Sequence, residues 1–234
     1  MTITYIRRGL KINNLEIKNV LKKHGVQNLY HCNTVETSLS FIKNGGLLSR
    51  EFCEKSKLPQ TPQKTDLSDK EYNIYNDIFF DASEIQKKTG ISYYGPVLFV
   101  YDVNVLDTIE GDIYITKCNL ITWHNILESE RCFETLKDLS DNFCEEDFGQ
   151  HIVLKNQKKP LSFKYLLKIV LSNPQKDDNS IFEIARKTIA EEIKFNKINV
   201  PIEIRDCKHI KRFSDTYRDF TELEKHFGLG GHEC

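Results

Sequence analysis

The stretch that decides the fold is LYHCNTVETSLSFIKNGGLLSR, residues 29–50. It opens with a short apolar run, and we expect residues 28–32 to form a strand that carries His31 near its end. The apolar side chains that follow repeat at nearly helical spacing: Val35, Leu39, Phe41 and Ile42. The sequence "NGG" at 44–46 tolerates the left-handed backbone that ends a helix. The stretch therefore predicts a strand, a histidine, a helix and a glycine turn, in that order.

Further elements are expected on both sides of this stretch. Residues 15–24 predict a short helix with Asn14 as its N-cap and Gly25 as its stop. Apolar runs predict strands at 97–101, 112–116, 150–156, 164–172 and 200–206. Helical patterns cover 126–143 and 181–193, the second after a capping box of Ser180 and Glu183. Because strands and helices do not alternate regularly, the order predicts an α+β domain rather than a doubly wound sheet.

Length and charge favour one soluble domain. The 234 residues predict a single domain over 1–234, with a mobile loop or loosely helical insertion at 51–73 and a C-terminal appendage at 175–234. The 33 basic and 34 acidic residues almost cancel, so no overall positive field attracts nucleic acid. Seven cysteines without a CxxC pair indicate reduced thiols. With no signal peptide and no apolar span of about 20 residues, we expect a cytoplasmic protein without a membrane partner.

Two segments carry a resemblance to a known family. "LYHCNT", the helix and "NGGLLSR" resemble the first motif of ADP-ribosyltransferases of the diphtheria-toxin-like branch, in particular DarT-like toxins and RNA 2'-phosphotransferases. Residues 148–172 resemble the later strand at whose start DarT-like enzymes carry a catalytic glutamate. The resemblance implies a split antiparallel or mixed sheet with peripheral helices, and NAD as substrate. It also implies a nucleic-acid base as acceptor, in a toxin or an anti-phage defence effector with an antitoxin or immunity partner.

The same resemblance implies roles for the residues of the first motif. His31 would grip the ribose of NAD while the bond to nicotinamide breaks through an oxocarbenium-like state. Arg50, just after the glycine turn, would pair with a phosphate of NAD, or it is an ordinary surface arginine, and an aromatic ring would stack on nicotinamide. Small or glycine residues would let the backbone approach NAD. The expected NAD-binding residues are Tyr30, His31, Asn33, Gly45, Gly46, Arg50, Tyr93 and Tyr94.

At the glutamate position this sequence has Gln150. A glutamine can hydrogen-bond a ribose but cannot take a proton at neutral pH. Either a nearby carboxylate serves, with Glu145, Glu146 and Asp147 the nearest choices, or the activity is altered or absent. On a strand, His151 would point to the face opposite Gln150. Asp77, Lys158 and Lys159 are the expected substrate contacts. The basic residues at 155–159 have aromatic neighbours that suit a single strand of DNA or RNA, although a solvated face explains them equally well.

Two other functions stay open at the level of sequence. In the stretch 75–86, Asp77 and Asp81 would share one face of a strand and could hold a divalent metal in a nuclease. Alternatively, both aspartates cap turns around the apolar residues between them. The third hypothesis, suggested by Gln150, is a non-catalytic module of the same fold that senses a nucleotide or binds a partner.

Overall fold

The computed structural model describes residues 12–84, 94–174, 180–207, 225, 227 and 228. Its centre is a seven-stranded sheet in the order β5-β6-β3-β1-β4-β8-β9. The strands are β1 (Asn28–Asn33), β3 (Ile78–Asp81), β4 (Val97–Asp102), β5 (Ile113–Ile115), β6 (His151–Leu154), β8 (Leu166–Asn173) and β9 (Ile202–Asp206). A separate ribbon pairs β2 (Gly46–Leu47) with β7 (Leu161–Ser162). Neighbouring strands run antiparallel except β8 and β9, which are parallel.

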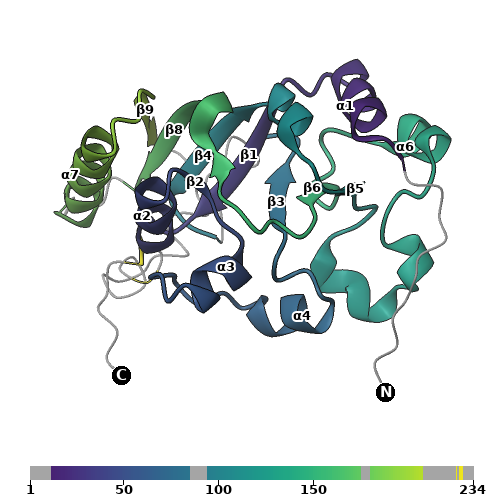
Figure 1. Cartoon of the computed structure of the whole chain (residues 1–234), viewed down its shortest axis with the longest axis horizontal. Helices are drawn as coiled ribbons and strands as arrows, with labels where there is room; N and C mark the ends of the chain where they lie inside the picture. Colours follow the sequence, from purple (N-terminus) through teal and green to yellow (C-terminus); the bar gives the residue numbers. More distant parts are fainter. Residues whose placement is uncertain (1–11, 85–93, 175–179, 208–224, 226, 229–234) are drawn as a thin grey trace.

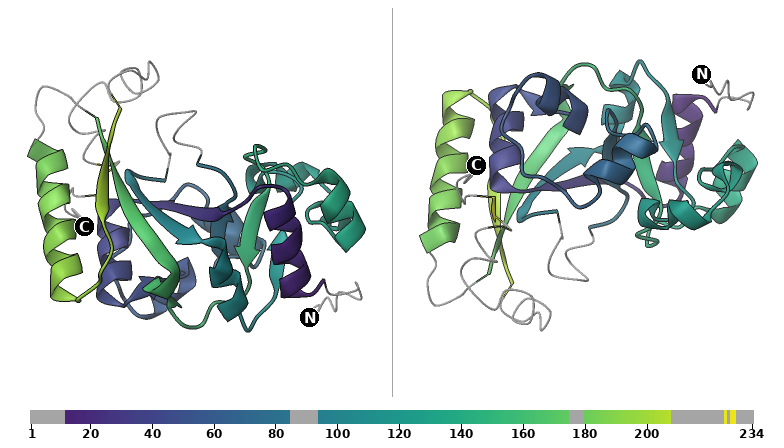
Figure 2. Two further views of the ribbon diagram at one scale, coloured as in Figure 1. Left: turned by 90° about the horizontal axis from the view of Figure 1, so that it is seen from above. Right: turned by 90° about the horizontal axis from the view of Figure 1, so that it is seen from below.

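Helices lie at both ends of the sheet and also beside its middle (Figure 1). They are α1 (Asn14–Lys23), α2 (Val35–Lys43), α3 (Arg50–Lys55), α4 (Asp66–Glu71), α6 (Leu136–Asn142) and α7 (Ser180–Phe195). Short 3₁₀ turns cover η1 (Val103–Thr108), η2 (Leu120–Asn125), η3 (Glu128–Glu130) and η4 (Phe163–Tyr165). Helix α2 packs against α7 beside β8 and β9, and α1 packs against α6 at the other end (Figures 1 and 2). The short helices α3 and α4 lie beside the middle of the sheet, next to β1 and β3 (Figure 1).

One main core lies on the face of the sheet that the helices cover. Alternate strand residues such as Leu29, Phe80 and Phe99 are fully buried there, together with Phe41 of α2 and Ile189 of α7. The opposite face carries a smaller apolar cluster of Leu98, Val100 and Val170, against which the side chains of Tyr30 and Cys32 pack. Because successive strand residues face opposite ways, His31 shares the main-core face with Leu29.

The sheet is split where β1 meets β3. Strand β1 pairs with β4 over six residues, from Asn28 to Asn33, but with β3 through the single pair Tyr30 and Asp81. Continued antiparallel pairing would place residues 31–33 opposite 78–80, and those segments instead diverge. We call this place the seam. It lies at the end of the strand that carries His31.

The elements predicted from the sequence are largely present. The strand at 28–32 and the helix that follows it are confirmed, with Thr34 as the N-cap of that helix. The strands expected at 97–101, 112–116, 150–156, 164–172 and 200–206 and the long helix α7 are confirmed within a few residues at each end. The α+β class and the split, mainly antiparallel sheet are confirmed as well.

Two local predictions need correction, those for α1 and for 126–143. Helix α1 begins one residue earlier than expected, because Asn13 rather than Asn14 accepts the capping hydrogen bond and forms a capping box with Glu16. The segment 126–143 is not one helix, because Cys132 bridges to Thr116 between η3 and α6. The polar segment 51–73 holds the two short helices α3 and α4. Within the part of the chain that the structure describes, no helix is long and apolar enough to cross a membrane.

Candidate functional site

A pocket opens at the seam and reaches both faces of the sheet. Four consecutive residues of β1, from Tyr30 to Asn33, line it, and so do four consecutive residues 78–81 of β3. Since neighbouring strand residues point to opposite faces, a pocket lined by consecutive residues must pass around the strand edges. The seam makes this possible because β1 and β3 are not paired there. Helices α3 and α4 and the loop between them close one side.

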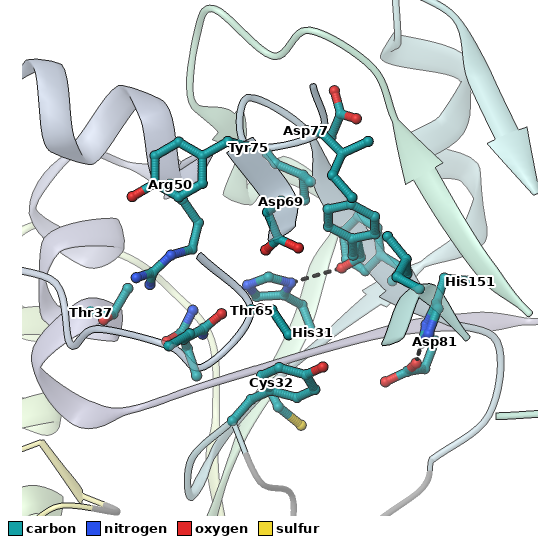
Figure 3. A pocket seen from close by; sticks show the side chains of 18 of the residues that line it. His31, Cys32, Thr37, Arg50, Thr65, Asp69, Tyr75, Asp77, Asp81 and His151 are labelled. Carbon is teal, nitrogen blue, oxygen red and sulfur yellow. Dashed lines mark hydrogen bonds and ion pairs between the residues drawn. The ribbon is translucent and has the colours of Figure 1, made fainter. Parts of the chain in front are cut away.

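His31 lies in the middle of this pocket (Figure 3). Its Nδ1–H donates to the carbonyl oxygen of Phe79 at 2.8 Å, in place of a ladder hydrogen bond that the diverging strands do not make. The ring packs between Phe41 and Phe80 at centroid distances of 5.8 and 5.9 Å. Burial lowers the pKa of His31 below its ordinary value, so the ring is neutral at pH 7. Its Nε2 atom is buried, and no residue that the structure describes forms a hydrogen bond with it.

Arg50 is the first residue of α3 and faces the same space. Its Nη2 donates to the carbonyl of Thr61 at 3.0 Å and to the carboxylate of Asp66 at 2.7 Å. These contacts fix the guanidinium, whose side chain is 13 % exposed. The Nε and Nη1 atoms are buried without a partner. A buried donor without a partner costs about 1–3 kcal/mol, so such atoms in a pocket indicate an acceptor-rich ligand.

Asp69 adds a carboxyl group from α4. Figure 3 shows it facing the His31 ring. Burial raises the pKa of Asp69, a hydrogen bond with Thr65 opposes the shift and the nearby Asp66 carboxylate adds to it, so that the resulting pKa is about 6. Asp69 therefore changes its charge in a pH range in which few carboxyl groups do. Titratable groups with such shifts are concentrated at functional sites.

The opposite side of the pocket carries a second group of polar residues. His151, the first residue of β6, lies directly across from Asp81 of β3, and its Nδ1 is 2.9 Å from the Asp81 carboxylate. Asp81 in turn lies across from Tyr30 of β1. Residues that face each other across antiparallel strands share one side of the sheet, so these three lie on the side away from His31. Cys32 lines the same side (Figure 3).

The structure brings part of the expected site together. Of the residues named from the sequence, the following line the pocket: Tyr30, His31, Asn33, Arg50, Asp77 and Tyr94. Tyr93 lies outside the described residues. Lys158 and Lys159 are exposed in the turn between β6 and β7 and do not line the pocket. Glu146 is exposed in the turn after α6 and is also outside the pocket.

Gln150, expected as a catalytic residue, lies outside the pocket lining. Its buried amide accepts a hydrogen bond from the backbone N–H of Cys144 at 2.8 Å and donates to the carbonyl of Asn142. These contacts anchor the turn that follows α6, and Gln150 does not line the pocket. The alternation of strand residues, noted in the sequence, turns His151 into the pocket instead. Gln150 is therefore a structural residue of this turn, for which a glutamine has the required donor and acceptor.

The glycines at 45 and 46 also have a packing reason rather than a place in the pocket. A Cβ atom on Gly46 would lie 2.3 Å from the carbonyl oxygen of Leu161, so the close approach of β2 and β7 requires glycine. Gly45 has a φ of +71°, which ends α2 as the sequence indicates. Both residues shape the turn after α2 and leave the pocket to neighbouring side chains.

Two pocket residues were missed from the sequence. Asp69 lies in a polar stretch without periodicity, which gave no sign of its direction. The sequence places His151 only on the strand face opposite Gln150, and the alternation rule identifies it as a pocket residue once the inward face of β6 is known. Asp81 was considered as a metal ligand, whereas its carboxylate pairs with His151.

Asp77 is held by protein partners. Its carboxylate pairs with the Lys155 ammonium at 2.5 Å and accepts the Asn156 N–H at 2.9 Å. This agrees with the turn-capping interpretation of Asp77. No group of three or more metal-ligating side chains is found among the residues described.

Comparisons with known proteins concern the fold. No protein-family model and no curated protein matches this chain. A structure of DarT from Thermus sp. 2.9 in complex with ADP-ribosylated ssDNA is similar, with a TM-score of 0.50 and 11% identity, covering 77% of this chain and 95% of that one. The complexes of that protein with NAD+ and carba-NAD+ give TM-scores of 0.48 and 0.46 at 12% and 11% identity, covering 77% of this chain and 96% of each. The resemblance noticed in the sequence is thus confirmed in the architecture: this chain has a DarT-like, ADP-ribosyltransferase-type fold.

Proposed function

We propose that this protein is an NAD-dependent ADP-ribosyltransferase that modifies a base of single-stranded nucleic acid. One observation carries the proposal: the pocket holds three buried nitrogen atoms that have no partner among the described residues, Nε2 of His31 and Nε and Nη1 of Arg50. A dinucleotide with ribose hydroxyls and a pyrophosphate supplies hydrogen-bonding groups for all three. The DarT-like fold supports the same ligand class.

The chemistry of the pocket suits a ribose. Because Nδ1–H of His31 is donated to Phe79 and the ring is neutral, Nε2 is an acceptor that takes a hydrogen bond from a ribose hydroxyl. Arg50 donates to the pyrophosphate. The Asp69 carboxylate, when ionised, accepts from a second hydroxyl and stabilises the positive charge that develops on the ribose as nicotinamide leaves. Asn33 and Thr37 line the same part of the pocket.

A single strand is the acceptor that this chemistry favours. A base in a duplex would first have to leave the stack, at a cost of a few kcal/mol. The structure with TM-score 0.50 is a complex of DarT with ADP-ribosylated ssDNA, which supports ssDNA over other acceptors. Such an activity would harm the cell that contains it. We therefore include in the proposal a toxin or anti-phage role inside the cell and a neutralising partner protein.

Incubation with labelled NAD and a panel of single-stranded DNA, RNA and protein tests the proposal. We expect label on single-stranded DNA with the mass of ADP-ribose, and at least 100-fold less label with Arg50→Gln. Arg186→Gln is the matched control, since that arginine is paired with Glu183 on the exposed surface of α7. Strand cleavage that needs magnesium and ignores NAD would select the nuclease hypothesis instead. Tight NAD binding without label on any acceptor would select the non-catalytic module.

A further inference from the structure

On the side of the pocket away from His31, a histidine and an aspartate are arranged as a general base and the carboxylate that orients it. The His151 Nδ1 and the Asp81 carboxylate are 2.9 Å apart, and the two side chains are 12 % and 22 % exposed. Each belongs to a regular strand, and the two residues are a direct pair in the β3–β6 ladder. Positions on paired strands hold side chains more rigidly than loop positions do.

This arrangement determines which nitrogen of His151 is available. Asp81 accepts the Nδ1–H, so the lone pair is on Nε2 and can receive a proton. The aspartate also stabilises the imidazolium that forms when the proton arrives, as in other catalytic pairs of this kind. Both residues line the pocket. The pair thus has the geometry of a general base.

The pair lies across the pocket from the proposed ribose site. His31 and the His151–Asp81 pair lie on opposite faces of the sheet, and the pocket joins them through the seam. A nucleophile that attacks a ribose carbon opposite a leaving group must come from the far side of that carbon. The acceptor side of the pocket is then the side with Cys32 and His151 (Figure 3), which Tyr30 also lines.

We propose that His151, held by Asp81, is the catalytic residue that removes the proton from the acceptor base. The inference rests on the proposed function and supplies the proton acceptor that Gln150 cannot be. The bond between ribose C1' and the nicotinamide nitrogen breaks, and nicotinamide leaves with the electron pair. A ring or exocyclic nitrogen of the acceptor bonds to C1', and its proton moves to Nε2 of His151. Asp81 is the positioning residue.

The experiment compares transfer to single-stranded DNA with hydrolysis of NAD to free ADP-ribose in the same reaction. Hydrolysis needs the ribose site but no deprotonated acceptor base. We expect His151→Ala to reduce transfer by at least 100-fold while NAD binding stays within about threefold of the original chain. Added imidazole should restore part of the transfer in His151→Ala, which a merely structural role would not allow. Asp81→Asn should also reduce transfer, because it favours the wrong tautomer.

His124→Ala is the matched control, since His124 is an exposed histidine of η2 outside the pocket. It should leave the ratio of transfer to hydrolysis unchanged. Equal loss of transfer and hydrolysis in His151→Ala, without rescue by imidazole, would overturn the inference. If the original chain neither binds nor consumes NAD, the proposed function fails. Full transfer by His151→Ala would instead leave that function intact and remove His151 from it.

Discussion

Replacement of His31 by phenylalanine should abolish NAD consumption and leave the free energy of unfolding nearly unchanged at neutral pH. Two opposing energies can be read from the structure. The buried Nε2 without a partner costs about 1–3 kcal/mol, and phenylalanine removes that cost. Phenylalanine also loses the 2.8 Å hydrogen bond to Phe79 and leaves that carbonyl without its donor, at a similar cost. We therefore expect the free energy of unfolding of His31→Phe to lie within about 1 kcal/mol of the original at pH 7.5.

Acid pH should shift this balance in a known direction. Burial lowers the pKa of His31 below its ordinary 6.5. The neutral ring contributes stability that is complete above 6.5 and is lost as pH falls through the pKa in the folded protein, because the unfolded chain takes up the proton first. One proton is worth at most about 1.4 kcal/mol per pH unit. His31→Phe should thus gain up to about 2 kcal/mol relative to the original chain by about pH 5.

Urea unfolding at both pH values and NAD consumption provide the measurements. We expect consumption to fall by at least 100-fold, since phenylalanine cannot accept from a ribose hydroxyl. His24→Phe is the control: that histidine contacts the carbonyl of Ser140 and the ring of Phe143, away from the pocket. It should keep full consumption. Consumption within threefold of the original in His31→Phe would refute the role of His31, and no relative gain at acid pH would refute its buried neutral state.

Three further changes probe the pocket and its frame. Asp77→Ala should lower the free energy of unfolding by about 3 kcal/mol, as measured by chemical denaturation. This is the low end of the cost of breaking a buried ion pair, because the Lys155 side chain is 22 % exposed and can regain water. An unchanged free energy of unfolding would contradict the pairing of Asp77 with Lys155. NAD affinity, followed by calorimetry, should weaken as pH falls through about 6 and Asp69 is protonated, and Asp69→Asn should abolish this dependence. Gly46→Ala should destabilise the fold by about 2 kcal/mol through contact with Leu161, and an unchanged melting temperature would argue against that crowding.

The fold was predictable where the relevant interactions are local. The order of strand, histidine, helix and glycine turn follows from periodicity and from caps such as Thr34, all within the stretch 29–50. The position of α7 follows from its apolar spacing in the same way. The split in the sheet did not follow from local pattern. It came from the family resemblance, because pairing between β1 and β3 depends on residues about 50 positions apart.

The site was predictable only in its first half. His31 and Arg50 lie in or beside the deciding stretch, and their direction follows from one strand and one helix start. The pair of Asp81 and His151 joins residues 70 positions apart, and only the register of β3 and β6 brings them together. Asp69 faces the pocket through the tertiary placement of a six-residue helix. A six-residue helix is too short for its apolar periodicity to show which of its faces points to the pocket.

The seam has a mechanical consequence. The strands on its two sides, β5-β6-β3 and β1-β4-β8-β9, are joined in the ladder by the pair Tyr30 and Asp81, with the His31–Phe79 hydrogen bond beside it. Separating them at this line breaks fewer backbone hydrogen bonds than separating β1 from β4. A molecule that bridges the pocket would add its own contacts to this weak joint. Binding should then slow amide hydrogen exchange in β1 and β3 more than in the edge strands, because the ligand would hold the two parts of the sheet together.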